Sequence, residues 1–346
     1  MSDAYHAVET LYHDYLTGLI LTTVTRRDAA SAAELVFRTF RRQHLEKFLP
    51  GLDKLGLRHL PHAVACGRYH YLSNQLGGVR VEYIEESPRK AWVRYVPPRW
   101  IYPGPSICAV PSDVTRAMLR GWHAHNGITL GNPRLGFVCT KMTTDGQPGL
   151  EGYYLEYDRE LAPGERLRFA PDEDAPDFDP DRAPVVPAAS WPETRLRKVA
   201  RNYTMDYVRS ILPELITTLG REDGRRLGTI TGLLIGMQDH AAAAADLGVA
   251  GRDAEAFAEF LRRLGEAQDD RVEWSREGNA VVVRQTTWRL MDGVSPLPDG
   301  VFECWNALWE GALSVHNRRL ALQVTRRLDR GDAAFEWRIV AAPPGR

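Results

Sequence analysis

The segment Gly121–Gly127 carries two histidines two residues apart, His123 and His125, at the predicted end of a helix. Side chains two apart on a regular helix point away from each other, but an end that unwinds before Asn126 could let both imidazoles converge. Imidazoles of this kind serve as general acid–base groups or as ligands of a divalent metal such as zinc, iron or manganese. The alternative is that both histidines only cap the helix and pack.

A second set, His62, Cys66 and His70, is spaced four apart on one predicted helix. A thiol one turn from an imidazole can form a nucleophile–base pair, and zinc could use the same groups with a carboxylate. We therefore keep Cys66 as a catalytic candidate. The alternative is a core cysteine beside two half-exposed histidines.

Glutamates recur directly before aromatic residues in predicted strands: Glu82, Glu156, Glu273 and Glu336. The acid and the aromatic side chain should point to opposite faces of a strand. Glu82 and Glu156 are thus candidates for a general base or an assisting carboxylate. The competing interpretation, which we favour, is a structural pairing with arginine, such as Arg94 or Arg284.

Arginine and aromatic residues gather around the predicted strand that ends near Val96. Arginine forks bind carboxylates, and aromatic rings line small-ligand pockets, so this region predicts a pocket for a small anionic, ring-bearing ligand. The alternative is a well-packed sheet with a surface arginine. The residues expected to bind substrate are Trp92, Arg99, Trp100, Trp122 and Asn126.

The elements that must position these residues occur twice along the chain. The repeated segments are Val81-Glu82-Tyr83 with Val272-Glu273-Trp274, Leu155-Glu156-Tyr157 with Phe335-Glu336-Trp337, and Trp122 with Trp309. Similar segments in the same order indicate a duplicated module. We expect an α+β protein with copies at 1–169 and 190–346, joined by an acidic, proline-rich linker at 170–189.

Each copy should contain two long helices, a third helix, a strand pair, a fourth helix and a closing hairpin. The first copy is expected to have helices at 3–23, 28–49, 62–75 and 112–125, and strands at 79–84, 91–96, 135–143 and 153–157. The second copy should begin with a capping box at 190–193 and continue with helices at 253–267 and 301–315 and strands at 272–275, 280–286, 320–328 and 334–340.

Four glycines recur every fourth residue in the second copy: Gly224, Gly228, Gly232 and Gly236. On a helix they share one face, where each costs about 1 kcal/mol relative to alanine. We expect backbone-close packing against another helix. The alternative is a groove for a ligand or a partner chain.

Composition limits the classes of partner and compartment. The 346 residues carry 44 basic and 45 acidic side chains, a net charge of −1, which argues against nucleic acid or an anionic membrane as partner. Four scattered cysteines, no leader-like start and no long apolar run suggest a soluble, cytoplasmic protein. No P-loop, GxGxxG or HExxH motif is present.

The tryptophan-bearing helix followed by the hairpin Gly331–Trp337 resembles the vinyl-reductase-type small-molecule-binding fold and the related L-2-amino-thiazoline-4-carboxylic acid hydrolase family. The same shape recurs loosely from Asp145 to Tyr157. The resemblance covers about the last 80 residues of each copy and carries over no catalytic residue. It implies hydrolysis of a small cyclic C–N or C–S compound, or small-molecule sensing.

Together these observations predict a hydrolase that acts on a small polar or ring-containing metabolite, with its site in the first copy. There His123 and His125 would be acid–base groups or metal ligands, because the second copy lacks the paired histidines. Two alternatives stay open. One is a non-catalytic small-molecule-binding or sensor module, and the other is a structural protein that forms a homodimer through its glycine face.

Overall fold

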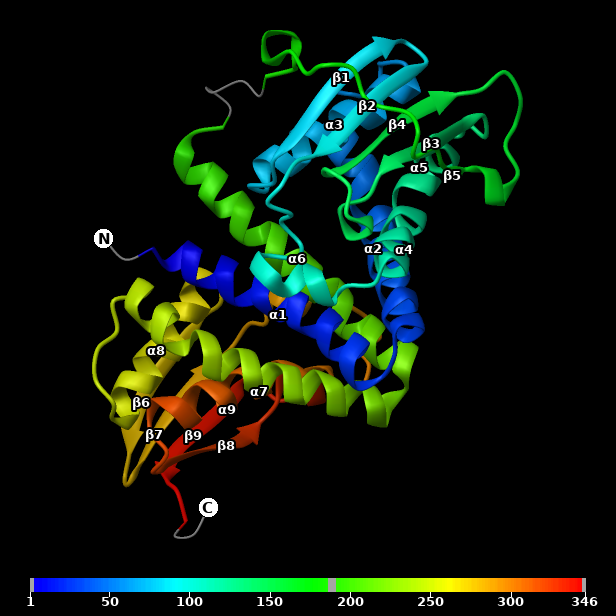
Figure 1. Cartoon of the computed structure of the whole chain (residues 1–346). Helices are drawn as coiled ribbons and strands as arrows, with labels where there is room; N and C mark the ends of the chain where they lie inside the picture. The colour runs from blue at the N-terminus through cyan, green and yellow to red at the C-terminus, as the bar shows by residue number, and fades with distance from the viewer. Residues whose placement is uncertain (1–2, 186–190, 344–346) are drawn as a thin grey trace. The chain divides into compact units, whose positions relative to one another are not determined.

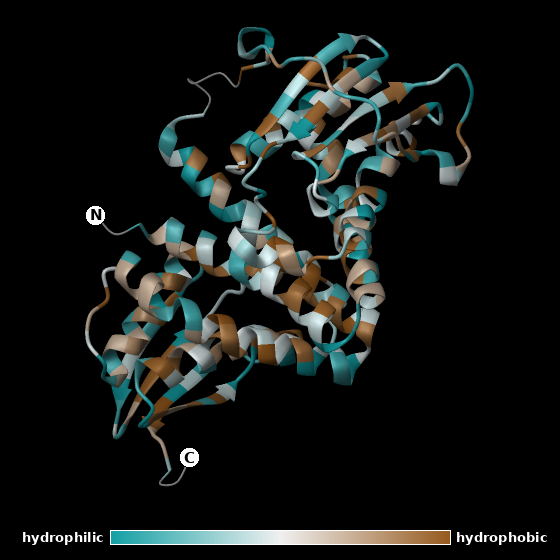
Figure 2. Ribbon diagram, viewed as in Figure 1, coloured by the Kyte–Doolittle hydropathy of each residue, from teal (hydrophilic) through white to brown (hydrophobic). Residues whose placement is uncertain are grey.

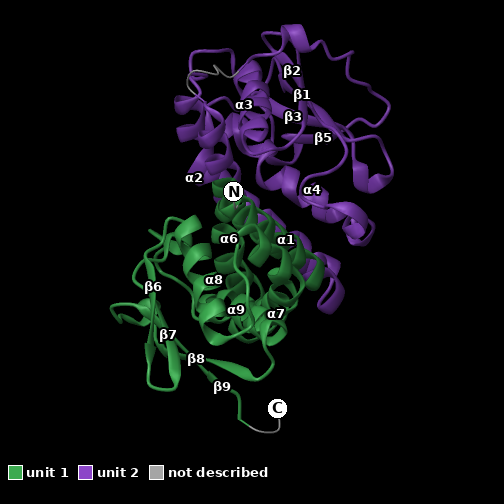
Figure 3. Ribbon diagram, turned by 90° about the vertical axis from the view of Figure 1, so that its left-hand side faces the viewer, with its two compact units in different colours: residues 1–22, 201–346 green, residues 23–200 purple. Residues whose placement is uncertain are grey.

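The computed structural model describes residues 3–185 and 191–343, and within them the chain forms nine α-helices and two β-sheets. The α+β class expected from the sequence is thereby confirmed (Figure 1). The chain divides into two compact units (Figure 3). Unit 1 comprises residues 1–22 and 201–346, and unit 2 comprises residues 23–200.

Unit 2 contains a five-stranded sheet of order β1-β2-β4-β3-β5, antiparallel except for the β3–β5 pair. Its principal elements are α2 (Ala29–Lys54), α3 (His62–Leu76), β1 (Val81–Ser87), β2 (Lys90–Tyr95), α4 (Ser112–Gly121), α5 (Asn126–Thr129), β3 (Leu135–Lys141), β4 (Leu150–Glu156) and β5 (Leu167–Phe169). Helix α3 packs closely on the sheet, because a Cβ at Gly67 would meet the Tyr83 ring at 2.8 Å.

Unit 1 contains a four-stranded antiparallel sheet of order β6-β7-β9-β8. Its elements are α7 (Arg221–Asp246), α8 (Ala254–Ala267), β6 (Val272–Glu277), β7 (Ala280–Gln285), α9 (Val301–His316), β8 (Leu320–Arg326) and β9 (Phe335–Ala341). Helices α1 (Ala4–Arg26) and α6 (Glu193–Leu219) each begin in one unit and end in the other.

The sequence placed several boundaries correctly and some wrongly. The helix expected at 28–49 is α2, which Asp28 caps by accepting a hydrogen bond from the Ser31 amide at 2.6 Å. Pro50 was expected to end this helix, but α2 continues to Lys54, because Phe48 and Leu52 stay buried on either side of the proline. The expected capping box begins at Ser190, which lies outside the described residues, as do residues 186–189 of the expected linker and 344–346 of the tail.

The two sheets correspond strand by strand. Both place the first strand pair beside the following hairpin in the same order, and both have a register shift near the end of the hairpin's first strand, β3 in unit 2 and β8 in unit 1. In unit 2 Glu151 stands opposite Arg94, and in unit 1 Glu336 stands opposite Arg284. The counterpart of Glu336 is therefore Glu151 rather than Glu156. The duplication as such stays a prediction.

The glycines of α7 confirm the packing interpretation of their four-residue spacing. Cβ atoms at Gly228 and Gly232 would collide with Cys304 and Ala307 of α9, and one at Gly236 would overlap the Leu308 carbonyl oxygen. Gly311 of α9 in turn lies against the Leu233 backbone. The glycine face is thus occupied within unit 1. A homodimer would need a different surface.

Hydropathy follows this architecture. Figure 2 shows apolar residues along α7, α9 and the strands of each sheet. Large buried aromatic side chains fill the core of unit 1: Phe257, Phe260, Trp305, Phe335 and Trp337. Among the described residues, no helix combines the length and apolar character needed to cross a membrane.

Candidate functional site: a buried histidine cluster

Five polar side chains, each from a different element of unit 2, meet between α3 and the sheet. We call them the histidine cluster: His70 of α3, Tyr95 of β2, His123 of the 3-10 turn that follows α4, Asn126 of α5, and Tyr154 of β4. All are at most 8% exposed. Tyr95 and Tyr154 point to the helix side because alternate residues of a strand share a face.

Hydrogen bonds join all five members. The Asn126 amide nitrogen donates to the Tyr154 hydroxyl at 3.0 Å and lies 3.3 Å from Nε2 of His70. On the other side of its ring, Nδ1 of His70 lies 2.8 Å from the Tyr95 hydroxyl, which is 3.5 Å from Nε2 of His123.

These distances favour one consistent set of proton positions. If Asn126 donates to Nε2 of His70, then Nδ1 of His70 carries the proton and donates to Tyr95. Tyr95 can then donate to Nε2 of His123. His123 is consequently left with a protonated Nδ1.

The cluster is also a stack of rings. The His70 and His123 rings lie 4.3 Å apart at 19°, and the His123 and Tyr154 rings are almost parallel at 6.0 Å. The Phe137 ring adds an edge at 4.6 Å from His123. Aromatic rings therefore lie around His123 on several sides, and those of His70 and Tyr154 are nearly parallel to it.

The histidines of the cluster are held neutral. Burial lowers the pKa of His123 to about 3, helped by the neighbouring His44 and by the positive charge of Arg99. Burial, together with His123 and His44, lowers the pKa of His70 well below its ordinary value. Burial also raises the pKa of Tyr154, with small contributions from Cys66 and Tyr95. All five side chains are thus uncharged near neutral pH.

Several polar atoms in and beside the cluster are buried and unsatisfied. Nδ1 of His123, Oδ1 of Asn126, Nε1 of Trp122 and Nε2 of His44 have no hydrogen-bond partner in the described part of the chain. Each such group costs about 1–3 kcal/mol if nothing satisfies it. Native cores rarely carry so many such atoms together.

His44 and Trp122 form one side of the site. Their rings meet edge to face at 5.5 Å, and the Trp122 ring lies 6.1 Å from His70. Arg41 donates to Nδ1 of His44 at 2.7 Å, which leaves the proton of His44 on Nε2. Burial, with help from the Arg41 charge, lowers the pKa of His44 to about 3.

His125 does not join His123. Its Nδ1 bonds to the Arg120 carbonyl at 2.8 Å, and it is only half-buried. The chain does unwind at the end of α4, as the sequence suggested, but the 3-10 turn sends the two rings to different partners. Within residues 3–185 and 191–343, no three His, Cys, Asp or Glu side chains gather as a metal site would require.

The predicted carboxylates lie outside the cluster. Glu82 pairs with Arg94, whose Nε lies 2.5 Å from its Oε2, as the structural interpretation expected. Glu156 accepts from Asn132 at 2.9 Å and from Arg134 at 2.6 Å at the end of β4. Neither is bonded to His123.

The thiol and the predicted substrate-binding residues divide between two faces of the sheet. Cys66 is fully buried, and burial raises the pKa of its thiol against a smaller opposing effect of Asn126, so a thiolate is not favoured. Trp92 packs on Tyr153 on the opposite face and donates to Glu86 at 2.7 Å. Arg99 lies 5.3 Å over the Tyr95 ring, at the border of the cluster, and Trp100 follows it, half-buried.

Sequence reasoning singled out His123, Trp122 and Asn126 but gave no role to Tyr154 or His44. His70 was noted only for its spacing to Cys66. Tyr154 could have been found in Leu150–Tyr154, which also has a glutamate shortly before aromatic residues. His44 left no signal, because only the packing of α2 on α4 brings it to Trp122.

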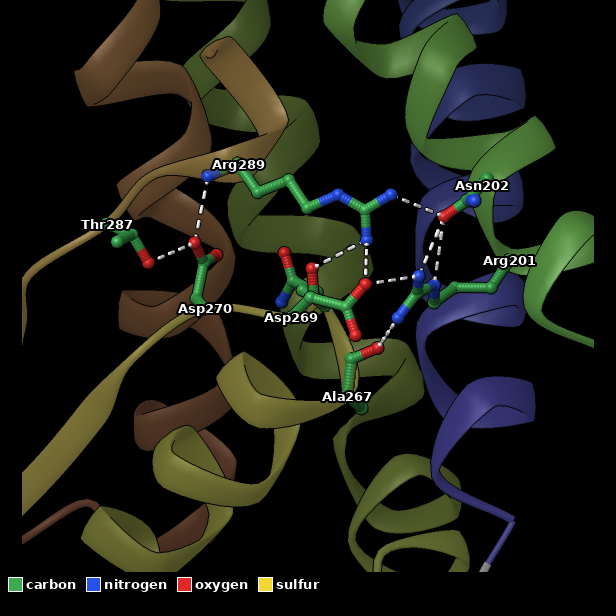
Figure 4. Close-up of polar contacts among 8 residues, drawn as sticks. Arg201, Asn202, Ala267, Asp269, Asp270, Thr287 and Arg289 are labelled. Atoms are coloured by element: carbon green, nitrogen blue, oxygen red, sulfur yellow. Dashed lines mark hydrogen bonds and ion pairs between the residues drawn. The ribbon is translucent and has the colours of Figure 1, made fainter.

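A second buried polar network lies in unit 1 and differs in kind (Figure 4). The Arg201 side chain is fully buried and bonds to Asp269 at 3.0 Å, to the Ala267 carbonyl and to Asn202. Arg289 donates to the same Asp269 and to Asn202. Both arginines of this network pair with Asp269, which indicates a structural role, and we call the network the arginine clasp.

No protein-family profile matches the chain, and comparison with curated proteins finds no significant relative.

Proposed function

We propose that the chain is a non-catalytic small-molecule-binding protein and that its site is the histidine cluster of unit 2. The observation that carries this proposal is the set of four buried, unsatisfied polar atoms on His44, Trp122, His123 and Asn126. A bound molecule would satisfy them, and water could do so only where the space is polar and wide enough.

The chemistry of the site favours an uncharged, flat ligand. Three of the unsatisfied atoms, on His44, Trp122 and His123, are N–H donors in the proton arrangement given above, so the ligand should offer carbonyl or ring-nitrogen acceptors. Asn126 supplies the one open acceptor. The neutral histidines add no charge of their own for an anion, so the positive charge near the site is that of Arg41 and of Arg99 at its border.

Hydrolysis of a small ring compound is the competing proposal. It would need a base, and His123 has a depressed pKa and no bonded carboxylate among the described residues. The resemblance to small-molecule-binding folds agrees with binding as well as with hydrolysis. No contact favours hydrolysis specifically.

The test is a ligand screen on the full chain by thermal shift and ligand-observed NMR, using uncharged heteroaromatic fragments. His123→Phe removes the open Nδ1 and keeps an aromatic ring. His240→Phe is the matched control, because His240 is also buried with an unsatisfied Nδ1, but in unit 1. Hits should disappear in His123→Phe and persist in His240→Phe.

Two outcomes would count against binding at this site. One is a screen without hits, and the other is hits that His123→Phe leaves unchanged. The same NMR samples report turnover. Conversion of a hit that stops in His123→Phe would replace the binding proposal with the hydrolase.

A further inference from the structure

The outermost strands β3 and β8 correspond in the two sheets, but their free edges differ. In unit 2 the edge of β3 is covered by β5, and every residue of β3 but the last is buried. In unit 1 β8 has β9 as its one strand neighbour within the described chain, and every residue of β8 is at least partly exposed. The covered edge of β3 therefore shows which kind of segment can pair with the corresponding edge of β8.

The cover of β3 is an extended segment that ends in acidic residues. The Phe137 amide donates to the Arg166 carbonyl at 2.8 Å, and the Ala170 amide donates to the Cys139 carbonyl at 2.9 Å. Beyond β5 the chain crosses the outer face of the sheet at 171–175, a part of the expected linker. There Lys141 binds the Pro171 carbonyl at 2.7 Å and the Asp174 carboxylate at 2.8 Å.

The open edge of β8 carries matching groups. Lys141 stands opposite Glu151 and Arg326 stands opposite Glu336, so Arg326 is the counterpart of the lysine that holds the acidic segment. Its side chain is 60% exposed, with Glu336 4.0 Å away. By the same register, the Leu322 amide and the Val324 carbonyl occupy the edge positions that bind β5 in unit 2.

The surroundings of β8 are basic. Arg318 and Arg319 precede the strand and are exposed, and Arg330 follows it with 65% of its side chain exposed. Two of the neighbouring arginines have acidic partners within unit 1: Arg327 is held by Glu303 and Asp329, and Arg330 lies 3.9 Å from Glu303. An acidic segment would therefore meet favourable charge along the whole edge.

We propose that β8 is a docking edge for an extended acidic segment of a partner protein, which adds to the sheet as a strand. Backbone bonds to Leu322 and Val324 would supply the pairing, and Arg326 would hold carboxylates beyond it, as Lys141 does in unit 2. The bland alternative is that the arginines only guard an open edge against aggregation.

The chain supplies a probe for this edge, the peptide of residues 166–175 that covers β3 and Lys141 in unit 2. Its binding to the full-length protein can be followed by fluorescence polarisation of a labelled peptide. Arg326→Glu should weaken binding about tenfold, because it replaces an attractive charge pair by a repulsive one. Arg221→Glu is the control, since Arg221 is also an exposed arginine of unit 1, with 73% of its side chain exposed.

Further variants separate this edge from other sites. Arg319→Glu should act like Arg326→Glu, and a peptide with Asp172, Glu173 and Asp174 replaced by lysine should not bind. Hydrogen exchange at the Leu322 amide should slow when the peptide is bound. Circular dichroism checks that each variant is folded.

Three results would overturn the proposal. The peptide could fail to bind the wild-type protein at millimolar concentration, which would leave the arginines with a protective role. Binding could be equally strong in Arg326→Glu, as expected if the peptide exchanged with β5 in unit 2. A single-stranded DNA oligonucleotide could bind the wild-type protein while the acidic peptide does not, and the partner would then be a nucleic acid rather than a protein segment.

Discussion

Asp269 combines an unfavourable backbone with a favourable charge, and replacing it by glycine should separate the two. Its φ of 64° lies in the left-handed region, where Gly78 stands at the corresponding turn of unit 2. Glycine would relieve about 1 kcal/mol of strain. It would also remove the carboxylate that pairs with Arg201 and Arg289.

The charge should dominate. Removing the partner of a buried ion costs about 3–5 kcal/mol, but Asp269 is 38% exposed, so solvent reduces the loss to about 2–3 kcal/mol. Arg201 itself is fully buried and keeps the Ala267 carbonyl, Asn202 and the face of the Tyr5 ring, 4.8 Å away, as partners. Asp269→Gly should therefore lose about 1–2 kcal/mol, and Asp269→Ala about 1 kcal/mol more because it keeps the strain.

Urea denaturation of the full chain, with hydrogen exchange of the amides of α8 as a local measure of unit 1, gives both differences. The order of stability should be wild type, then glycine, then alanine. A glycine variant more stable than the wild type would mean that the clasp adds nothing. Equal stability of the glycine and alanine variants would refute the strain argument.

Further predictions concern close packing and pH. Gly236→Ala should lower the free energy of unfolding by about 2–4 kcal/mol in urea denaturation, because its Cβ would overlap the Leu308 carbonyl, whereas Gly164→Ala has open space and should change little. Burial lowers the pKa of His240 to about 4, so its contribution to stability is present above pH 6.5 and is lost as the pH falls towards 4; thermal melts of His240→Phe should show a weaker loss over that range. Burial and, to a smaller extent, Asp14 raise the pKa of Asp239 to about 7. The stability that the protonated Asp239 contributes is therefore present below pH 3.8 and is lost as the pH rises through 7. Asp239→Asn should flatten this part of the plot of melting temperature against pH, and an unchanged plot would contradict the raised pKa.

Local patterns foretold much of the fold. Alternating apolar and polar residues between glycine turns predicted the strands, and the four-residue spacing of Gly224 to Gly236 predicted the packed face of α7. Both patterns depend on residues that are near neighbours in the chain. The pairing of Glu82 with Arg94 also followed from their strands. The register that makes Glu151 the counterpart of Glu336 did not, since it depends on how β4 pairs with β2 and β3.

The site was foretold only in part. His123 and Asn126 stood out as polar residues at a helix end, but the same reasoning joined His123 to His125. The true neighbours, His70 and Tyr154, are 53 and 31 residues away in sequence and arrive through α3 and β4. Which side of a 3-10 turn faces the core is decided by that packing, and spacing alone cannot show it.

The correspondence between the units bears on why the cluster exists. Through the strand ladders, Tyr95 corresponds to Gln285 and Tyr154 to Ile339, and the turn at Gly78 and Asp269 aligns His70 with Leu261. Unit 1 thus forms a sheet of the same strand order with apolar residues in place of His70 and Tyr154 and an amide, Gln285, in place of Tyr95. There Leu261 and Gln285 border only a small cavity of about 10 Å³, near what one water molecule needs. The shared strand order therefore does not by itself require a histidine at position 70 or a tyrosine at positions 95 and 154. In unit 2 His70, Tyr95 and Tyr154 instead bond to His123 and Asn126, whose open polar atoms carry the proposed binding site.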